Sequence, residues 1–191
     1  MKKLLVSLAI AGAAIAAPVA TPVAAQTLPP AVIVIVDLDQ VFQTSTAGKQ
    51  ALTELKSRAD AIQARLQTLR TSFGTEEQSL GQTRPTAPGP TATAWEAKVK
   101  DFTTRKTQAE QELAKRDQDL QASRQFVVKQ LNDASQPIIS TVMKERGASI
   151  ALAEGATLQH IASIDVTSDV VARLNAALPR VISTAPATAA K

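Results

Sequence analysis

Apolar residues recur at alternating spacings of three and four through the first half of this 191-residue chain. The positions are Leu52, Leu55, Ala59, Ile62, Leu66, Leu69, Phe73 and Leu80, and Glu76 replaces the apolar residue once. An average spacing of about 3.5 residues places them on one narrow stripe of an α-helix, which must therefore pack against a partner helix along its length. The pattern limits the chain to folds that contain a long helical pair.

A proline-rich break and a second apolar stripe supply the partner helix. Residues 84–93 contain Pro85, Pro88 and Pro90, which interrupt helices. The second stripe runs through Trp95, Val99, Phe102, Ala109, Leu113, Leu120, Val127, Leu131, Ile138 and Val142. We predict an antiparallel coiled-coil hairpin over residues 47–146, with residues 84–93 as its tip.

Capping residues mark the expected helix ends. The hydroxyl groups of residues 44–46 (Thr-Ser-Thr) can cap a helix that begins near Ala47. Thr93 and Glu96 form a capping box for the return helix, and Gly147 suits the position after its end. Thr167 is predicted to cap a last short helix.

Strand-like segments flank the hairpin at both ends. Residues 31–39 (AVIVIVDLD) contain five consecutive β-branched residues, which is typical of a strand buried on both faces. Residues 149–153 (SIALA) alternate polar and apolar side chains, and residues 158–161 are a second candidate strand. One small chain cannot be expected to cover the first strand on both faces, so the strand predicts association of several copies.

These elements define the expected fold class. It is α+β and predominantly α, with a long coiled-coil hairpin (a tentacle) projecting from a small β body that trimerises. The body would combine residues 26–46 with residues 147–182. Residues 183–191 are mostly Ala, Thr and Pro, and are predicted to be disordered.

The first 25 residues resemble a cleaved secretory signal. Lys2 and Lys3 precede an uninterrupted stretch of apolar and small residues, and a small-residue cleavage motif ends at Ala25. The apolar stretch is shorter than the roughly 18 residues expected of a spanning helix. We therefore expect an exported, periplasmic protein and not an uncleaved membrane anchor.

The composition argues against an enzyme and against a bound cofactor. The chain has no cysteine, and His160 is its only histidine, so a zinc site built from these residue types is excluded. No glycine-rich phosphate loop occurs. Asp37 and Asp39 could form an acid–base pair, but we interpret them as the polar end of a strand. Basic residues alternate with acidic ones, so no nucleic-acid partner is expected.

Several segments resemble the Skp (OmpH-like) family of periplasmic chaperones. They are residues 35–42 (IVDLDQVF), 47–49 (AGK), 136–139 (QPII), 144–152 (KERGASIAL) and 164–175 (IDVTSDVVARLN). The resemblance implies a homotrimer in which three hairpins surround a cavity. It also implies an ATP-independent holdase that keeps unfolded outer-membrane proteins from aggregating. Contact with a membrane or with lipopolysaccharide follows from the same resemblance, but no residue is assigned to it.

Candidate interaction residues fall into two groups. The predicted trimerisation residues of the body are Val32, Val34, Ile35, Val36, Ile150 and Leu152. The predicted client-contact residues of the arms are Trp95, Phe102, Arg105, Lys106, Lys115 and Arg116. At helical spacing, the two aromatic residues are also suited to the apolar seam between the helices.

An alternative function belongs to a different class. The chain could be a periplasmic coiled-coil adaptor or spacer whose hairpin tip docks on one folded partner. Such adaptors usually carry further β domains beside the hairpin, for which this chain is too short. A holdase should suppress the aggregation of many clients, whereas an adaptor should bind a single partner.

Overall fold

A computed structural model describes residues 30–186, and all of its helices and strands belong to the unit that begins at Ala31. The predicted signal over residues 1–25 lies outside the described residues. The elements of the unit are β1 (Ile33–Val36), α1 (Leu38–Thr44), α2 (Thr46–Gln82), α3 (Pro90–Glu145), β2 (Ile150–Ala153), two short 3-10 turns (Glu154–Ala156 and Ala162–Ile164) and α4 (Thr167–Ala177).

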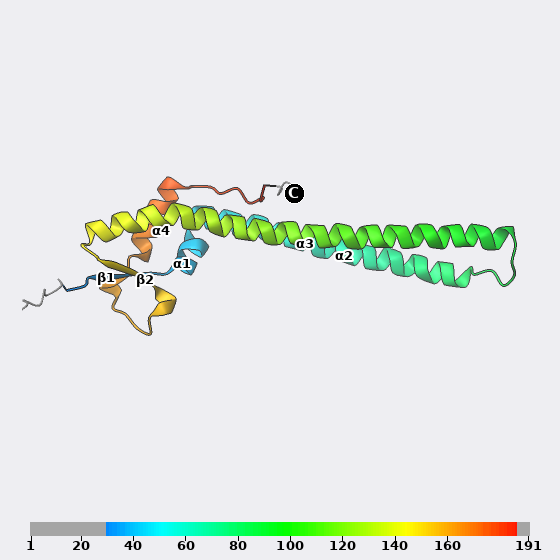
Figure 1. Cartoon of the computed structure of the whole chain (residues 1–191), viewed down its shortest axis with the longest axis horizontal. Coiled ribbons are helices and arrows are strands. Elements are labelled where there is room, and N and C mark those ends of the chain that lie inside the picture. The colour runs from blue at the N-terminus through cyan, green and yellow to red at the C-terminus, as the bar shows by residue number, and fades with distance from the viewer. Residues whose placement is uncertain (1–29, 187–191) are drawn as a thin grey trace, which may run out of the picture. The chain divides into compact units, whose positions relative to one another are not determined.

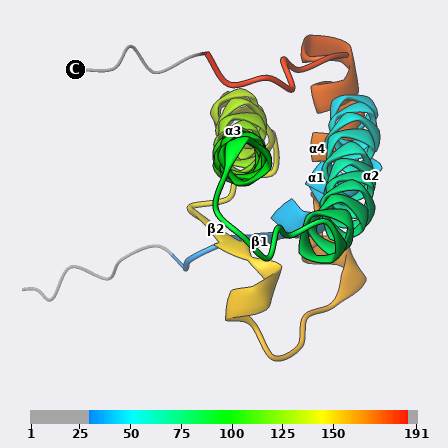
Figure 2. The ribbon, with the colours of Figure 1, turned by 90° about the vertical axis from the view of Figure 1, so that its right-hand side faces the viewer.

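Helices α2 and α3 form the predicted antiparallel hairpin (Figure 1). The buried residues of α2 repeat every seven positions at Leu55, Ile62 and Leu69. On α3 the buried residues are Phe102, Ala109, Leu120, Ser123, Val127, Leu131, Ser135 and Val142. Viewed along the hairpin, the two helices run side by side (Figure 2). Leu52 departs from the predicted seam, because 53% of its surface is exposed.

The ends of the two long helices differ in part from the prediction. Ser45 caps α2, since its Oγ accepts a hydrogen bond from the Gly48 N–H. The capping box at Thr93 is wrong, because α3 already begins at Pro90 after an N-cap at Gly89. Proline suits the first helical position, where its fixed φ is helical and no N–H donor is needed. Gly147 follows α3 with a φ of 63°, as predicted.

The body contains a two-stranded parallel sheet. β1 pairs with β2 in a register that sets Ile33 beside Ile150 and Val36 beside Ala153. On the other side of β1, the Val166 N–H donates to the Ile35 carbonyl. The entire hairpin is therefore the connection between two neighbouring parallel strands.

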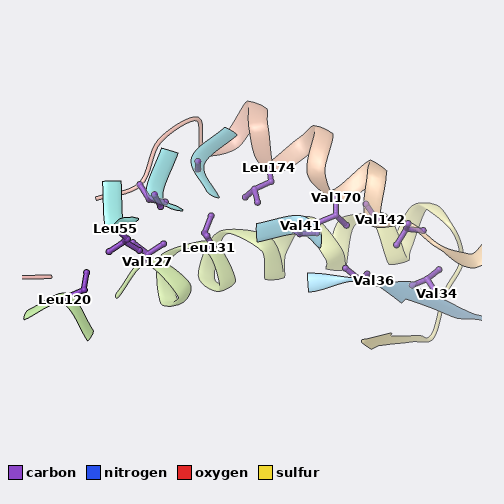
Figure 3. Packing of buried hydrophobic residues seen from close by; sticks show 14 of the residues in the cluster. Val34, Val36, Val41, Leu55, Leu120, Val127, Leu131, Val142, Val170 and Leu174 are labelled. Carbon is purple, nitrogen blue, oxygen red and sulfur yellow. The ribbon is translucent and has the colours of Figure 1, made fainter. Parts of the chain in front are cut away.

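Helices α1 and α4 pack on the base of the hairpin and complete the core (Figure 3). The core there is built from Val34, Val36, Val41, Val142, Val166, Val170 and Leu174. Arg173 of α4 also forms an ion pair with Glu145 at the end of α3. The core thus joins both ends of the hairpin to the sheet.

A single chain buries most of β1. This contradicts the expectation that several copies are needed to cover both faces of the strand. Val34, Ile35 and Val36 are only 2–3% exposed. Core residues of the hairpin base, α1 and α4 cover Val34 and Val36. The more exposed apolar positions are Val32 at 46% and Ile150 at 40%.

Helix α1 was not predicted. It replaces the end of the expected strand, and Asp37 is its N-cap, with Oδ1 accepting from the Gln40 N–H at 2.8 Å. Asp37 and Asp39 therefore lie at a helix start and not on one strand face. Leu38, Val41 and Phe42 have the spacing of one helix face, which explains the preference for a helix.

Two predictions for residues 154–167 are also wrong. Residues 158–161 form no strand, and Leu158 and Ile161 are exposed. Thr167 is the first residue of α4 and not its N-cap. Its N–H donates to Asp165 Oδ1, while its Oγ1 accepts from the Asp37 N–H at 2.9 Å. Thr167 thus ties the start of α4 to the end of β1.

The prediction that the chain is disordered from residue 183 is wrong for residues 183–186. Ser183 is buried, and Val181 just before it belongs to the core. This part of the chain runs beside the hairpin base (Figure 1).

The corner between α1 and α2 requires glycine at position 48. A Cβ on Gly48 would lie 1.6 Å from the Phe42 carbonyl oxygen, whereas one on Gly74 in the same helix would meet nothing within 4 Å. We predict that Gly48→Ala lowers the free energy of unfolding by about 3 kcal/mol or more. The control Gly74→Ala should raise it by about 1 kcal/mol. Thermal and urea unfolding measure both, and a stable Gly48→Ala protein would contradict the packing at this corner.

Candidate functional site

The candidate sites among the described residues are surfaces of the arms and of the body. Among residues 30–186, no group of three or more His, Cys, Asp or Glu side chains could hold a metal ion. The Nε2 atom of His160 lies 3.5 Å from a carboxylate oxygen of Glu154. No helix of this part of the chain combines the length and apolar character that crossing a membrane requires. The candidate sites are therefore the faces of the arms and the body.

The predicted aromatic contacts lie in the seam of the outer arm. Phe102 is buried and meets Phe73 edge to face, with ring centroids 5.7 Å apart. Trp95 is half-buried, and its Nε1–H donates to the Leu80 carbonyl at 2.9 Å. The Arg84 guanidinium lies 5.8 Å from the centroid of the indole ring. The structure thus places both predicted aromatic residues between α2 and α3, where they hold the outer arm together.

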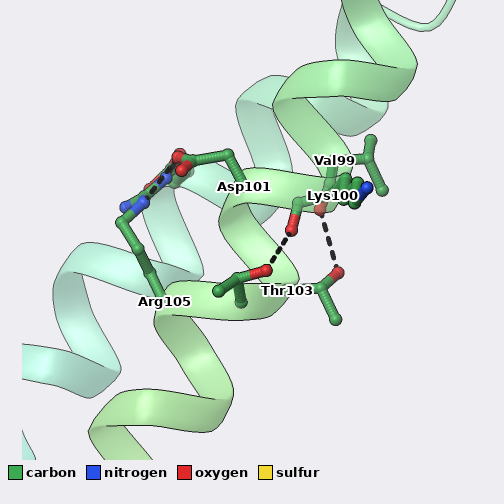
Figure 4. A network of polar contacts seen from close by, with 7 residues as sticks. Val99, Lys100, Asp101, Thr103 and Arg105 are labelled. Carbon is green, nitrogen blue, oxygen red and sulfur yellow. Dashed lines mark hydrogen bonds and ion pairs between the residues drawn. The ribbon is translucent and has the colours of Figure 1, made fainter.

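Arg105 joins the two helices through a charged network (Figure 4). Its guanidinium donates to both carboxylate oxygens of Glu76 on α2 and, through Nε, to Asp101 on its own helix. These hydrogen bonds lower the pKa of Glu76 and raise that of Arg105. Glu76 interrupts the apolar stripe in the sequence, and this ion pair is the reason that the interruption is tolerated.

The other predicted basic residues differ in their partners. Arg116 lies 2.7 Å from Glu112, which also contacts Arg65 of α2 and has a lowered pKa chiefly because Arg65 donates to it. Lys115 lies 3.3 Å from Asp119, four positions later on α3. Lys106 is exposed. Lys106 and Lys115 therefore present their charges to solvent, whereas Arg105 also bonds across the hairpin.

Two grooves that sequence reasoning missed flank the seam near Ala109. One, of about 340 Å³, is lined by Leu66, Phe73 and Leu113, with Lys106 and Glu110 beside them. The other, of about 350 Å³, is lined by Leu69, Phe73, Arg105 and Glu112, among others. Ala109 lines both. A small residue at a seam position, here Ala109, is the sequence signal for such a gap in the packing. The first groove offers mainly apolar contacts, whereas the second combines apolar with charged and polar side chains.

The predicted trimerisation residues divide by exposure. Val34, Ile35 and Val36 are buried within the chain, Leu152 is half-buried, and Val32 and Ile150 are exposed. Leu158 and Ile161, which were not assigned a site, are exposed by 103% and 68%. In the described residues β2 pairs with β1 alone, so its outer edge is unpaired. The available surface of the body is therefore the β2 edge and the loop after it.

Glu76 should make the stability of the arm pH-dependent. A carboxyl whose pKa is lowered by folding contributes stability that is present above its unfolded pKa and is lost as the pH falls. We expect the melting temperature to be constant near neutral pH and to fall as the pH drops below 4.5, the ordinary value for glutamate. Glu54, Glu112, Glu145 and Asp165 also have lowered pKa values and act in the same direction.

Glu76→Gln tests the contribution of this one carboxyl, with Glu77→Gln as the matched control on an exposed neighbour. The first variant should show a smaller decrease of melting temperature between pH 6 and pH 3 than the wild type. The control should follow the wild type. Equal acid sensitivity of wild type and Glu76→Gln would contradict the role assigned to the Arg105–Glu76 pair.

Comparisons with known proteins place the chain in a family. A family model described as outer membrane protein (OmpH-like) matches residues 32–174. The fold is similar to a solved structure from Caulobacter crescentus CB15 described as a candidate outer membrane chaperone (OmpH-like), with a TM-score of 0.68 and 21% identity. That match covers 82% of this chain and 92% of the other. A comparison with curated proteins found no match. Because the family model spans most of its length, the chain belongs to the OmpH-like outer membrane protein family.

Proposed function

We propose that this protein is an ATP-independent periplasmic holdase that binds unfolded outer-membrane proteins and slows their aggregation. The observation that carries the proposal is the outer arm, where two open grooves flank one seam: one has a mainly apolar lining, and the other combines apolar with charged and polar side chains. Family membership and the chaperone description of the Caulobacter structure support the same function. The function is not enzymatic and needs no cofactor or nucleic acid.

Weak and distributed contact is the physical basis of the proposal. Each groove can accept an apolar side chain, and nearby charges such as Lys106 and Glu110 can contact polar groups of the same client. Individually small contacts on a linked scaffold add up to useful affinity, because every contact after the first is intramolecular. Since no single contact dominates, the client is held without being forced into one conformation.

We further propose that three copies assemble through the body. The proposal rests on two features of the body: Ile150, Leu158 and Ile161 are exposed apolar residues, and within the described residues the outer edge of β2 is unpaired. Unpaired strand edges and exposed apolar side chains both favour association with another chain. Three arms around a common axis would multiply the number of grooves available to one client.

Two variants separate assembly from folding. The double variant Leu158→Asp and Ile161→Asp should remain folded but sediment as a monomer, because both side chains are exposed in the single chain. Val34→Asp should instead unfold the body, since it buries an unpaired charge at a cost of several kcal/mol. Analytical ultracentrifugation and circular dichroism measure the two effects. A wild-type protein that is a folded monomer at micromolar concentration would contradict the trimer.

Aggregation of an unfolded outer-membrane β-barrel protein, measured by light scattering, tests the holdase function. When this protein is added at a concentration up to that of the client, it should reduce the light scattering of the aggregating client in the absence of ATP. Lys106→Gln combined with Lys115→Gln should weaken client affinity by no more than about thirtyfold, because exposed charge contacts contribute at most about 1 kcal/mol each. Lys144→Gln, an exposed position at the body end of α3, is the control. Raising the salt concentration should speed client release without abolishing binding.

The adaptor remains the second candidate, and the ordered tip favours it. Trp95 bonds to the Leu80 carbonyl, and Arg84 packs over its ring, so both helix ends are fixed beside the tip. An adaptor should fail to suppress the aggregation of unfolded proteins. It should also no longer bind its one folded partner when residues 84–93 are replaced by a short turn. If one alanine substitution on an arm abolished client binding, the holdase proposal would also be wrong.

A further inference from the structure

After α4, the chain runs back along the hairpin base in an extended conformation (Figure 1). We call residues 181–185 the C-terminal strap. Burial alternates along it: Val181 and Ser183 are buried, whereas Ile182 and Thr184 are exposed. A period of two is that of a β-strand laid on a surface, with every second side chain directed toward that surface. The hairpin base therefore holds an extended peptide segment.

Side chains of both long helices bind the main chain of the strap. The Gln130 amide pairs with Ile182 in both directions, accepting from its N–H at 3.1 Å and donating to its carbonyl at 2.8 Å. This is the double exchange that a hydrogen-bonded residue pair makes in an antiparallel sheet. Arg58 Nη1 donates to the Ser183 carbonyl at 2.9 Å, and Ser123 Oγ accepts from the Ala185 N–H at 3.3 Å. None of these bonds depends on the identity of the strap's side chains.

Two side-chain positions of the strap are selective. Val181 is buried in the hydrophobic core cluster, so this position takes an apolar residue. The Ser183 hydroxyl donates to the Glu54 carboxylate, which lowers the pKa of Glu54, and Arg58 Nη2 donates to the Ser183 Oγ at 3.2 Å. The position of Ser183 therefore takes a small residue with a hydroxyl group.

A hollow of about 260 Å³ adjoins the end of the strap. It is lined by Thr184, Ala185 and Pro186 together with Ile62, Arg116 and Leu120 of the hairpin, among others, and Asp119 also lines it. Apolar and charged side chains of the hairpin therefore continue the surface past Ser183. An extended client segment could contact them as well as the groups that bind the main chain of the strap.

We propose that Glu54, Arg58, Ser123 and Gln130 form a binding site for an extended polypeptide segment, and that the C-terminal strap occupies it as an internal ligand. The proposal rests on the holdase function, because it names unfolded client segments as the competing ligand. A tethered ligand has an effective concentration in the millimolar range for a short linker. The strap therefore keeps weak ligands out and yields to clients that also bind the arms.

The test uses the full-length chain and a labelled seven-residue peptide with the sequence of residues 180–186 (RVISTAP). Ser183→Asp in the chain should release the strap, because it replaces the hydroxyl that donates to Glu54 by a second carboxylate, and Arg58 then faces both negative charges. Ile182→Asp is the matched control, since it adds the same charge one position earlier on an exposed side chain. Fluorescence anisotropy should show at least tenfold tighter peptide binding to Ser183→Asp than to wild type or to the control.

Adding Gln130→Ala to the Ser183→Asp chain should weaken peptide binding at least tenfold. Amide hydrogen exchange provides a second measurement: the Ile182 and Ala185 amides should be protected in wild type and in the control, and unprotected in Ser183→Asp. If Ser183→Asp loses protection of these amides but binds no peptide, the proposed binding site is wrong and the strap has only a structural role. Unchanged protection in Ser183→Asp would also overturn the proposal.

The aggregation assay separates this proposal from the holdase function. If the peptide fails to bind while the wild type still suppresses aggregation, only the binding site at the hairpin base is wrong. If the peptide binds as expected but no variant suppresses aggregation, the holdase function and the client as competing ligand are wrong. If both hold, Ser183→Asp should suppress aggregation at a lower chain concentration than Ile182→Asp.

Discussion

The parallel pairing of β1 with β2 is the constraint on which the rest of the structure depends. It continues in the bond from the Ser149 N–H to the Val32 carbonyl, which joins main-chain groups 117 positions apart in sequence. Parallel neighbours cannot be linked by a tight turn, so a long connection must leave the sheet and return to it. Here that connection is the whole hairpin. Thr167 then fixes the start of α4 to the end of β1 through its bond from the Asp37 N–H. Helix α4 thereby packs against the core at the base of the hairpin.

Fewer large apolar side chains pack between the two long helices in the outer part of the hairpin than at its base. This difference is the structural basis of the proposed function. At the base, valine and leucine side chains of α1, α3, α4 and β1 form a continuous core. Farther out, the seam depends on Ala109, on the Phe73–Phe102 contact and on the Arg105–Glu76 ion pair. Small residues and ion pairs leave the flanking grooves open. A rigid base with an open outer arm suits a protein that must hold changing partners without a fixed pocket.

The sequence predicted those features that depend on periodic burial. The hairpin, its tip region and the strand at Ile150 follow from the spacing of apolar residues and from proline, and they are confirmed. Helix α1 was missed because the valine-rich run before Asp37 hid the helical spacing of Leu38, Val41 and Phe42. The strap could not be predicted, because its main chain is bound by distant side chains such as Gln130, and such contacts leave no pattern in the strap's own residues.

The central claim is that clients are held in an unfolded state on open surfaces. Hydrogen exchange of an outer-membrane β-barrel protein, measured while it is bound to this chain, tests the claim most directly. The account predicts that the client's amides exchange at nearly unfolded rates while the client stays soluble. Strong protection of client amides, or binding of the folded barrel alone, would contradict it.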